Sequence, residues 1–144
     1  MTTDANTMQF EYIVEGGNFT RAGYASSEIK KILKQLNVDL AIIKRTVVAC
    51  YEAEVNVVAH SYGGTIFVDI DHQSIRIKLV DDGPGIPDVN LAMQEGFSTA
   101  SSKVREMGFG AGMGLPNIKK NADLFEISSE LTKGTTLEIT MFLQ

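Results

Sequence analysis

Apolar and polar residues follow two different periods along this chain. Alternation over residues 8–14, 65–70 and 75–80 predicts strands, because successive side chains of a strand point to opposite faces of a sheet. A spacing of three and four residues predicts a helix that Ser26 or Ser27 would cap. The apolar residues at this spacing are Ile29, Ile32, Leu33 and Leu36.

A second, longer helix is predicted to begin after Asp39, a suitable N-cap, and to run to about His60. We expect Glu54, within this helix, to face solvent. The sequence Ser-Tyr-Gly-Gly at residues 61–64 would end the helix, because two adjacent glycines favour a turn. The predicted apolar stripe consists of Ile42, Ile43, Val47, Val48, Tyr51 and Val55.

The second half of the chain begins with a short predicted helix over residues 89–94. Residues 96–114 are rich in glycine, serine and threonine, and they predict a long, mobile loop. A third major helix is expected over residues 115–124, with a proline in its first turn, where proline is tolerated. A last hairpin is expected from strands over residues 125–129 and 135–143.

The order of these elements predicts an α+β fold. A doubly wound parallel sheet needs strands and helices in regular alternation. The predicted order lacks it, with one strand, two helices, two strands, one helix and two strands. We therefore expect a two-layer α/β sandwich, in which helices cover one face of a mixed, mostly antiparallel sheet. Residues 8–144 would form a single domain, long enough to bury a hydrophobic core.

Composition and charge narrow the classes of function. The net charge of -5 argues against a nucleic-acid partner, which a protein binds through a basic face. No apolar run approaches the ~20 residues needed to cross a bilayer, so we expect no membrane partner and a cytoplasmic location. Cys50 is the single cysteine, and its apolar neighbours predict an inert core thiol.

The sequence Val-Asp-Asp-Gly-Pro-Gly-Ile-Pro-Asp at residues 80–88, here called the Asp-Gly loop, follows a predicted strand directly. A carboxylate at the end of that strand, Asp81, could accept a hydrogen bond from an exocyclic amine such as that of adenine. Gly83 and Gly85 would let a flat ring lie against the backbone. The alternative is an ordinary hairpin turn. It is weakened because no returning strand follows.

Glu52 and Asn56 are four residues apart on the second helix, which places both on one face. An amide oxygen such as that of Asn56 suits Mg²⁺, which keeps several waters and takes few protein ligands. The carboxylate of Glu52 could orient or deprotonate a nucleophile near the metal. The alternative is a solvated helix face, because a motif this short often occurs by chance.

Alternate glycines precede the third major helix, at Gly108, Gly110, Gly112 and Gly114. Free backbone N–H groups and the positive end of a helix dipole form a natural phosphate cradle. The spacing is neither the dinucleotide-binding fingerprint nor a P-loop, and the alternative is a flexible surface loop. The candidates for further phosphate contacts are Lys103, Arg105 and Thr135.

Taken in order, these three blocks resemble the ATP-binding domain shared by gyrase, Hsp90, histidine kinases and MutL. Glu52 and Asn56 match the N box of that superfamily, and Asp81 opens its D-x-G-x-G box. Residues 112–115, Gly-Met-Gly-Leu, match its second glycine box. The chain is most similar to the small serine/threonine kinases of the anti-sigma-factor and stressosome switch group. That similarity is carried by DGPGIPD at residues 82–88, EGFST at 95–99 and GAGMGLP at 110–116.

The resemblance implies a helix-on-sheet sandwich with a mobile ATP lid and Mg-ATP as cofactor. It implies phosphorylation of a serine or threonine on a small antagonist-type, STAS-like partner, upstream of a sigma factor or a stress complex. A homodimer would also fit the family. By resemblance, Asn56 is a Mg²⁺ ligand, Glu52 the catalytic carboxylate and Asp81 the adenine reader, and the glycines named above line the site.

Two hypotheses of different classes follow. The first is a Mg-ATP-dependent serine/threonine protein kinase that acts as a regulatory switch. The second is a nucleotide-gated module that binds its partner without phosphate transfer, and such a module would need Asn56 and Asp81 but not Glu52. The presence of Glu52 favours the kinase. A detached catalytic half of a histidine kinase is disfavoured, because no helical hairpin with a phospho-accepting histidine fits before the first strand.

Overall fold

The computed structural model describes residues 7–83, 93, 114–130 and 132–143. Its strands are β1 Met8–Glu15, β2 Gly63–Ile70, β3 Ser74–Asp81, β4 Leu124–Glu130 and β5 Gly134–Phe142. Its helices are α1 Tyr24–Gln35, α2 Leu40–His60 and α5 Gly114–Asn121, with a short 3₁₀ helix, η1, at Phe19–Arg21. Of the predicted short helix, residues 89–92 and 94 lie outside the described residues, as do residues 96–113 of the predicted loop; residue 114 begins α5.

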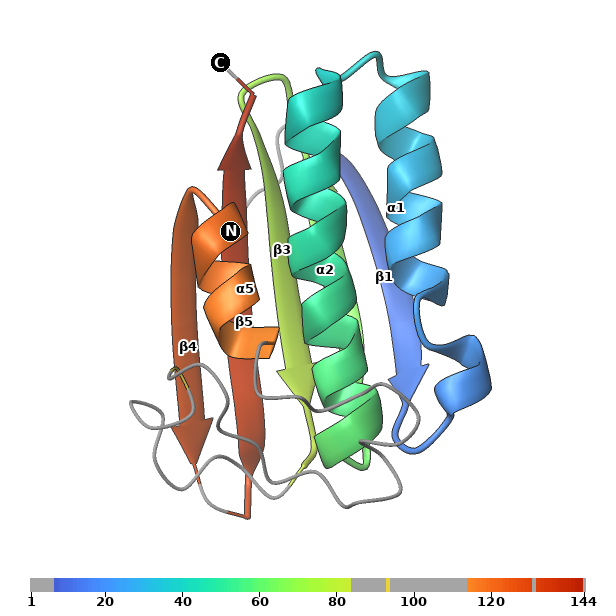
Figure 1. Cartoon of the computed structure of the whole chain (residues 1–144), viewed down its shortest axis with the longest axis vertical. Coiled ribbons are helices and arrows are strands. Elements are labelled where there is room, and N and C mark those ends of the chain that lie inside the picture. The colour runs from blue at the N-terminus through green and yellow to red at the C-terminus, as the bar shows by residue number, and fades with distance from the viewer. Residues whose placement is uncertain (1–6, 84–92, 94–113, 131, 144) are drawn as a thin grey trace.

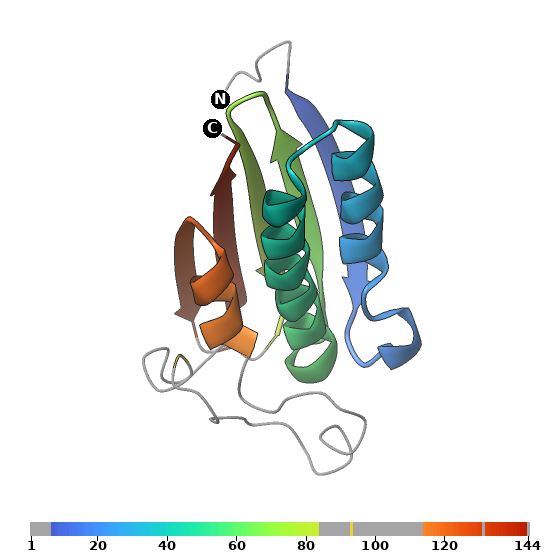
Figure 2. The ribbon, with the colours of Figure 1, turned by 45° about the horizontal axis from the view of Figure 1, so that its top comes forward.

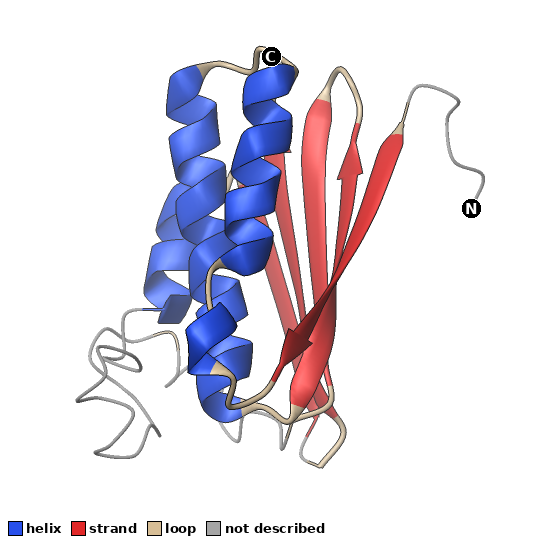
Figure 3. Cartoon of the chain, turned by 90° about the vertical axis from the view of Figure 1, so that its right-hand side faces the viewer, coloured by secondary structure: helices blue, strands red, loops and turns tan. Residues whose placement is uncertain are grey.

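The described strands form one five-stranded sheet in the order β1-β2-β3-β5-β4. Every neighbouring pair in it is antiparallel. The three α-helices lie on one face of this sheet, with α2 between α1 and α5 (Figures 1 and 2). Seen from the side, helices and strands form two layers (Figure 3). The predicted α+β sandwich is therefore confirmed, with an antiparallel sheet.

The hydrophobic core fills the space between the two layers. Alternate residues of β2, β3 and β5 are buried under the helices, as the period of two requires. The largest fully buried strand side chains are Ile66, Val68, Ile75, Ile77, Leu79, Leu137, Ile139 and Met141. Helices α1 and α5 contribute Ile29, Leu33 and Ile118. Cys50 is fully buried on α2, and burial raises the pKa of its thiol, which fits the predicted inert core position.

The beginning of α1 differs from the prediction. The helix starts at Tyr24 after a left-handed Gly23, so neither Ser26 nor Ser27 is its N-cap. The carboxylate of Glu54 takes the place of a local cap, accepting hydrogen bonds from the backbone N–H groups of Ala25 and Ser26, each at 3.1 Å. The Ser26 hydroxyl also donates to it at 3.1 Å. Glu54 is only 2% exposed, so the expectation that it faces solvent was wrong.

Helix α2 begins as predicted. Asp39 is its N-cap, and the Asp39 side chain accepts a hydrogen bond from the backbone N–H of Ala41 at 2.9 Å. The apolar stripe was predicted less well, because Tyr51 is exposed. The residues of α2 that are buried include small and polar side chains, since this helix packs against the sheet and against both neighbouring helices. They are Ile43, Thr46, Ala49, Cys50, Ala53, Glu54, Val55, Val57 and Val58.

Helix α5 ends three residues earlier than predicted, and β4 begins at Leu124. Asp123 fixes this junction. Its Oδ1 accepts a hydrogen bond from Arg45 of α2 at 2.7 Å, and its Oδ2 accepts one from the backbone N–H of Phe142 at 2.8 Å. The Arg45 hydrogen bond holds the pKa of the Asp123 carboxyl below its usual range. The C-terminal end of α5 is thus tied to both α2 and β5.

No helix in the described parts of the chain is both long enough and apolar enough to cross a bilayer.

Candidate functional site

The predicted site residues that the structure describes meet at one end of the fold. The C-terminal ends of α2 and β3 and the N-terminal end of α5 come together there (Figure 1). Two close approaches define this end. A Cβ at Gly83 would lie 2.7 Å from the hydroxyl of Ser61, the C-cap of α2. A Cβ at Gly114 would lie 3.6 Å from Oε2 of Glu52.

Asp81, the last residue of β3, is 6% exposed and its carboxylate is held by backbone groups. Its Oδ1 accepts hydrogen bonds from the N–H groups of Gly83, at 2.8 Å, and Thr135, at 3.2 Å. Within the described part of the chain, Oδ2 accepts no hydrogen bond. These two hydrogen bonds fix the plane of the carboxylate.

Glycine is required where β5 passes this carboxylate. Gly134 has φ +107°, and a Cβ there would overlap the backbone carbonyl oxygen of Asp81. The same added atom would come within 3.3 Å of Oδ1 of that carboxylate. Gly83 has a similar packing role, because the space beside its Cα is filled by Ser61. The absence of a side chain at Gly83 therefore serves contact with α2, in addition to any contact with a ligand.

Glu52 lies in the third turn from the C-terminal end of α2, partly buried where α2 packs against α5. Burial raises the pKa of its carboxyl, and a hydrogen bond from the side chain of Asn117 acts in the opposite direction. A carboxylate with a raised pKa beside the start of a helix is well suited to proton transfer.

Asn56 follows Glu52 by one turn on the same face of α2, about 6 Å along the helix axis. It is partly buried, as is His60, and burial lowers the pKa of the His60 imidazole. The amide oxygen of Asn56 suits Mg²⁺, which completes its shell with water and phosphate oxygens. Asn56 would hold the metal, which would neutralise phosphate charge.

Thr135 lies on the Asp81 side of the site. Its backbone N–H bonds Asp81, and its hydroxyl is 2.8 Å from the hydroxyl of Ser129 on β4. A phosphate contact by Thr135 stays a prediction. Six other predicted site residues lie outside the described residues, namely Gly85, Lys103, Arg105, Gly108, Gly110 and Gly112.

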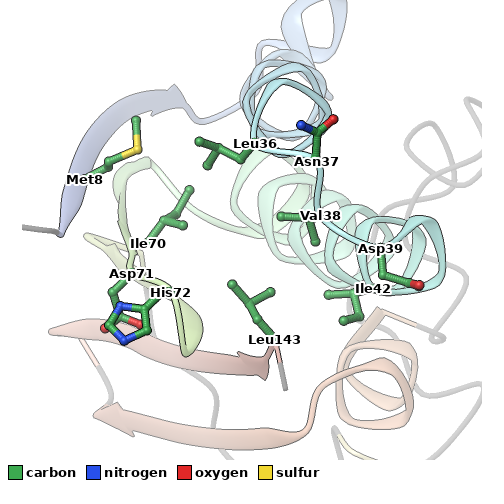
Figure 4. Close-up of a pocket in the computed structure, with 10 residues that line it drawn as sticks. All are labelled: Met8, Leu36, Asn37, Val38, Asp39, Ile42, Ile70, Asp71, His72 and Leu143. Atoms are coloured by element: carbon green, nitrogen blue, oxygen red, sulfur yellow. The ribbon is translucent and has the colours of Figure 1, made fainter.

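A separate cavity of about 430 Å³ lies at the opposite end of the fold (Figure 4). It opens beside the turn before β3, whereas Asp81 ends that strand, about 25 Å away by strand length. Its lining is mixed, with apolar side chains such as Leu36 and Ile42 beside polar ones that include Asp39 and Asp71 (Figure 4). Both carboxylates accept backbone N–H groups of their own turns, so they have a local structural role.

Sequence reasoning missed three residues at the site, Ser61, Gly134 and Asn117. Ser61 and Gly134 were assigned only to turns, and their contacts to Gly83 and Asp81 join segments far apart in the chain. Asn117 follows the second glycine box closely. That position was the only signal in the sequence that could have suggested its contact with Glu52.

Comparison with known proteins shows the family to which the chain belongs. Residues 41–144 match the family described as histidine kinase-, DNA gyrase B-, and HSP90-like ATPase. The serine/threonine-protein kinase RsbT of Bacillus subtilis (strain 168) is 29% identical over 119 residues, which cover 80% of this chain and 84% of that protein. The anti-sigma F factor of Thermoanaerobacter sp. (strain X514) is 28% identical over 143 residues, which cover 96% of this chain and 94% of that protein.

Two solved structures share the fold. One contains the RsbU and RsbW domains of Rv1364c from Mycobacterium tuberculosis, with a TM-score of 0.63 and 16% identity over 92% of this chain and 32% of that chain. The other is the mycobacterial sensor histidine kinase MprB, with a TM-score of 0.53 and 18% identity. The match covers 92% of this chain and 97% of that chain. The fold and the family match agree, and the chain belongs to the histidine kinase-, DNA gyrase B-, and HSP90-like ATPases.

Proposed function

We propose that this protein is a Mg-ATP-dependent serine/threonine protein kinase that switches a small regulatory partner. The observation that carries this proposal is the position of Glu52. Its carboxylate has a pKa raised by burial, and Oε2 lies beside Gly114, where the glycine-rich segment enters α5. A site that only bound nucleotide would gain nothing from a carboxylate there, because it would repel phosphate.

The reaction needs few protein groups. The hydroxyl oxygen of the partner's serine or threonine attacks the γ-phosphorus, the bond to the β-phosphate oxygen breaks, and ADP leaves. Glu52 orients that hydroxyl and accepts its proton. In phosphoryl transfer the protein mainly positions the reactants and stabilises charge. Backbone N–H groups at the start of α5 would contribute to that stabilisation.

The other site residues would hold the nucleotide. Oδ2 of Asp81 would accept a hydrogen bond from the exocyclic amine of adenine, because Oδ1 is occupied by two backbone N–H groups. Asn56 would bind Mg²⁺. Lys103 and Thr135 are candidates for phosphate contacts, together with the backbone of Gly110 and Gly112.

The partner is proposed from relatives. One relative is named a serine/threonine-protein kinase, and others are named anti-sigma F factors. These names support a small antagonist-type protein as the phosphate acceptor, with a sigma factor or a stress complex downstream. We place this reaction in the cytoplasm, where ATP is available, and propose a single domain over residues 8–144 that works as a homodimer.

Phosphate transfer can be tested in a lysate of the source organism. Purified protein, Mg²⁺ and γ-labelled ATP should give a labelled protein band whose phosphate is stable in acid and lost in alkali. Chelation of Mg²⁺ should abolish the band. An acid-labile band would instead indicate histidine phosphorylation. If ATP binds but no Mg²⁺-dependent band forms, the nucleotide-gated binding module replaces the kinase.

The role of Asp81 gives a sharp prediction about nucleotide choice. In Asp81→Asn, the two backbone N–H groups should hold the amide oxygen in the Oδ1 position, so the amide NH₂ replaces Oδ2. A donor would then face the adenine amine. We expect ATP affinity to fall by about 10- to 100-fold, since a hydrogen bond to a charged group contributes about 1.5–3 kcal/mol. Calorimetric titration of ATP and GTP measures this.

GTP provides the internal comparison for this experiment. The carbonyl of guanine can accept from the new amide, so GTP affinity should fall less than ATP affinity or should rise. The adjacent Asp82 is exposed, and Asp82→Asn is the matched control, with unchanged affinities expected. An equal loss for both nucleotides, or no loss in Asp81→Asn, would show that Asp81 does not read the base.

A further inference from the structure

Positive charge is gathered on the helix layer of this protein, although its net charge is -5. The basic residues of the described α-helices are Lys30, Lys31, Lys34, Lys44, Arg45, Lys119 and Lys120. Acidic residues are fewer on the same helices, namely Glu28, Glu52 and Glu54. Glu54 is buried and Glu52 is partly buried beside α5, so the outer surface of this layer is basic.

The open face of the sheet has the opposite charge. On each strand the residues that alternate with the buried ones point away from the helices, on the far side of the sheet layer (Figure 3). The acidic residues there are Glu11, Glu15, Asp69, Glu126, Glu130 and Glu138. Arg76 and Lys78 are the basic residues of this face in the described strands, and each lies 3.9 Å from a carboxylate. The two layers of the sandwich therefore differ in sign.

Most lysines of the helix layer have no acidic partner in the described part of the chain. The ion pairs of this layer are Lys31 with Glu28, at 3.2 Å, and Arg45 with Asp123, at 2.7 Å. No ion pair between described residues involves the other lysines of these helices, which are Lys30, Lys34, Lys44, Lys119 and Lys120. All five are exposed.

Helix stability explains only part of this charge. Lys34 lies in the last turn of α1, and Lys119 and Lys120 lie in the last turn of α5, where a cation stabilises the helix dipole. Lys44 is instead near the N-terminal, positive end of α2. Lys30 is four residues before Lys34, a spacing at which like charges repel.

Lys30 and Lys44 lie at about the same height on neighbouring helices. Helix α1 ends five residues after Lys30, and α2 begins four residues before Lys44. The two helices pack side by side and run in opposite directions (Figures 1 and 2). The fold therefore brings unpaired positive charges together from two helices, at the end of α2 that lies away from the proposed active site.

The chemistry of this surface favours an acidic protein over nucleic acid or lipid. Phosphate groups are best bound by the planar fork of arginine, and Arg45, the arginine of the described α-helices, is engaged by Asp123. A helix that lies on a membrane inserts an apolar face, but α1 buries its apolar side chains, such as Ile29 and Leu33, in the core. Leu40 is 74% exposed one turn before Lys44, and such a mixture of apolar and charged groups suits a protein interface.

We propose that the helix layer, centred on Lys30, Lys34 and Lys44, is a docking surface for an acidic face of the regulatory partner. This inference rests on the proposed function, since the partner is the protein that receives the phosphate. Lys44 precedes Glu52 by eight residues of α2, which is about 12 Å along the helix axis. A partner of about 100 residues, with a radius of gyration of about 13 Å, can therefore touch this surface and also reach the active site.

The kinetic test replaces Lys30, Lys34 and Lys44 together with Gln. The KM for the isolated partner should rise about tenfold, because each exposed charge contact contributes about two- to threefold. The kcat and the KM for ATP should not change. Added salt should raise the KM for the partner in wild type more than in this variant, since salt screens exposed charges.

A matched variant carries the same change in net charge on other parts of the surface. It replaces Arg76, Lys78 and Lys133 with Gln, each of which is ion-paired to a carboxylate outside the helix layer. Its KM for the partner should stay within about twofold of wild type. Thermal unfolding should show that both variants are folded. An equal rise of KM in both variants would overturn the inference, because net charge alone would then explain it.

A second readout does not depend on phosphate transfer. A short poly-glutamate peptide should shift the backbone amide NMR signals of α1 and α2 in the nucleotide-free protein. These shifts should be weak in the variant of Lys30, Lys34 and Lys44, and unchanged in the matched variant. Shifts that lie elsewhere, or tighter binding of duplex DNA or of phosphatidylserine vesicles to this surface, would overturn the inference.

The outcomes keep this inference apart from the proposed function. Failure of the kinase function would appear in the wild-type protein as absent phosphate transfer, with the peptide still bound at the helix layer. Normal phosphate transfer with an unchanged KM for the partner in the variant of Lys30, Lys34 and Lys44 would overturn the docking surface and leave the kinase function standing.

Discussion

Replacing Glu52 with Gln should lower phosphate transfer to the partner by about 10²- to 10⁴-fold, the usual contribution of a positioned general base. Gln keeps the shape of the side chain and an oxygen that can accept from Asn117, but it cannot take up a proton. ATP affinity should stay within about threefold, since Asp81 and Asn56 are unchanged. Transfer rates at saturating ATP and calorimetric ATP titrations measure the two quantities separately.

The same variant should remain folded. Burial raises the pKa of Glu52, so the ionised carboxylate disfavours the folded state, and stability is lost as pH rises through that raised pKa. A neutral Gln removes this cost, and the thermal midpoint at neutral pH should be equal or higher. Glu126→Gln, at an exposed position of β4, is the control. Activity of Glu52→Gln within threefold of wild type would remove Glu52 from the mechanism.

Loss of the Glu54 carboxylate should destabilise the protein by about 3 kcal/mol. Glu54→Ala leaves the buried backbone N–H groups of Ala25 and Ser26 without their acceptor, at about 1–3 kcal/mol for each orphaned group. It also opens a cavity between α1 and α2. Urea unfolding followed by circular dichroism gives the free energy of unfolding.

A matched variant distinguishes the effect of losing the buried Glu54 carboxylate from the effect of losing a glutamate charge at the surface of a helix. Glu28 lies on α1, and its carboxylate pairs at the surface with Lys31 at 3.2 Å. Glu28→Ala should therefore change stability by no more than about 0.5 kcal/mol. Glu54→Gln keeps one side-chain oxygen, so its loss in free energy of unfolding should lie between those of Glu54→Ala and Glu28→Ala. A loss below 1 kcal/mol in Glu54→Ala would mean that other groups satisfy the start of α1.

The strands were predicted well because their signal is local. In β2 and β3 every second residue is buried, and the side chains that follow this period are mostly Ile, Val and Leu. Asp39 was also found, because an N-cap bonds the backbone two residues away. The end of the Asp-Gly loop nearest β3 was placed correctly for the same reason, with Asp81 at the strand end.

Local sequence signals could not predict which group caps the start of α1, or that Glu54 is buried. Ser26 and Ser27 have the composition of a local cap, but the acceptor comes from Glu54, which is 28 and 29 residues further along the chain. A glutamate amid apolar residues of α2 gives no sign of which neighbour will satisfy it. Asn117 and Gly134 were missed for a related reason, because their roles arise from contacts with Glu52 and Asp81.

The central claim is that phosphate passes from ATP to a hydroxyl of the partner. A single-turnover experiment with excess protein, Mg²⁺, isolated partner and γ-labelled ATP tests it most directly, by following the label in ATP, inorganic phosphate and partner at the same time. We expect label to move from ATP to a serine or threonine of the partner in wild type and to stay in ATP in Glu52→Gln. Label that remains in ATP, or that appears only as inorganic phosphate while the partner stays bound, would contradict the kinase function.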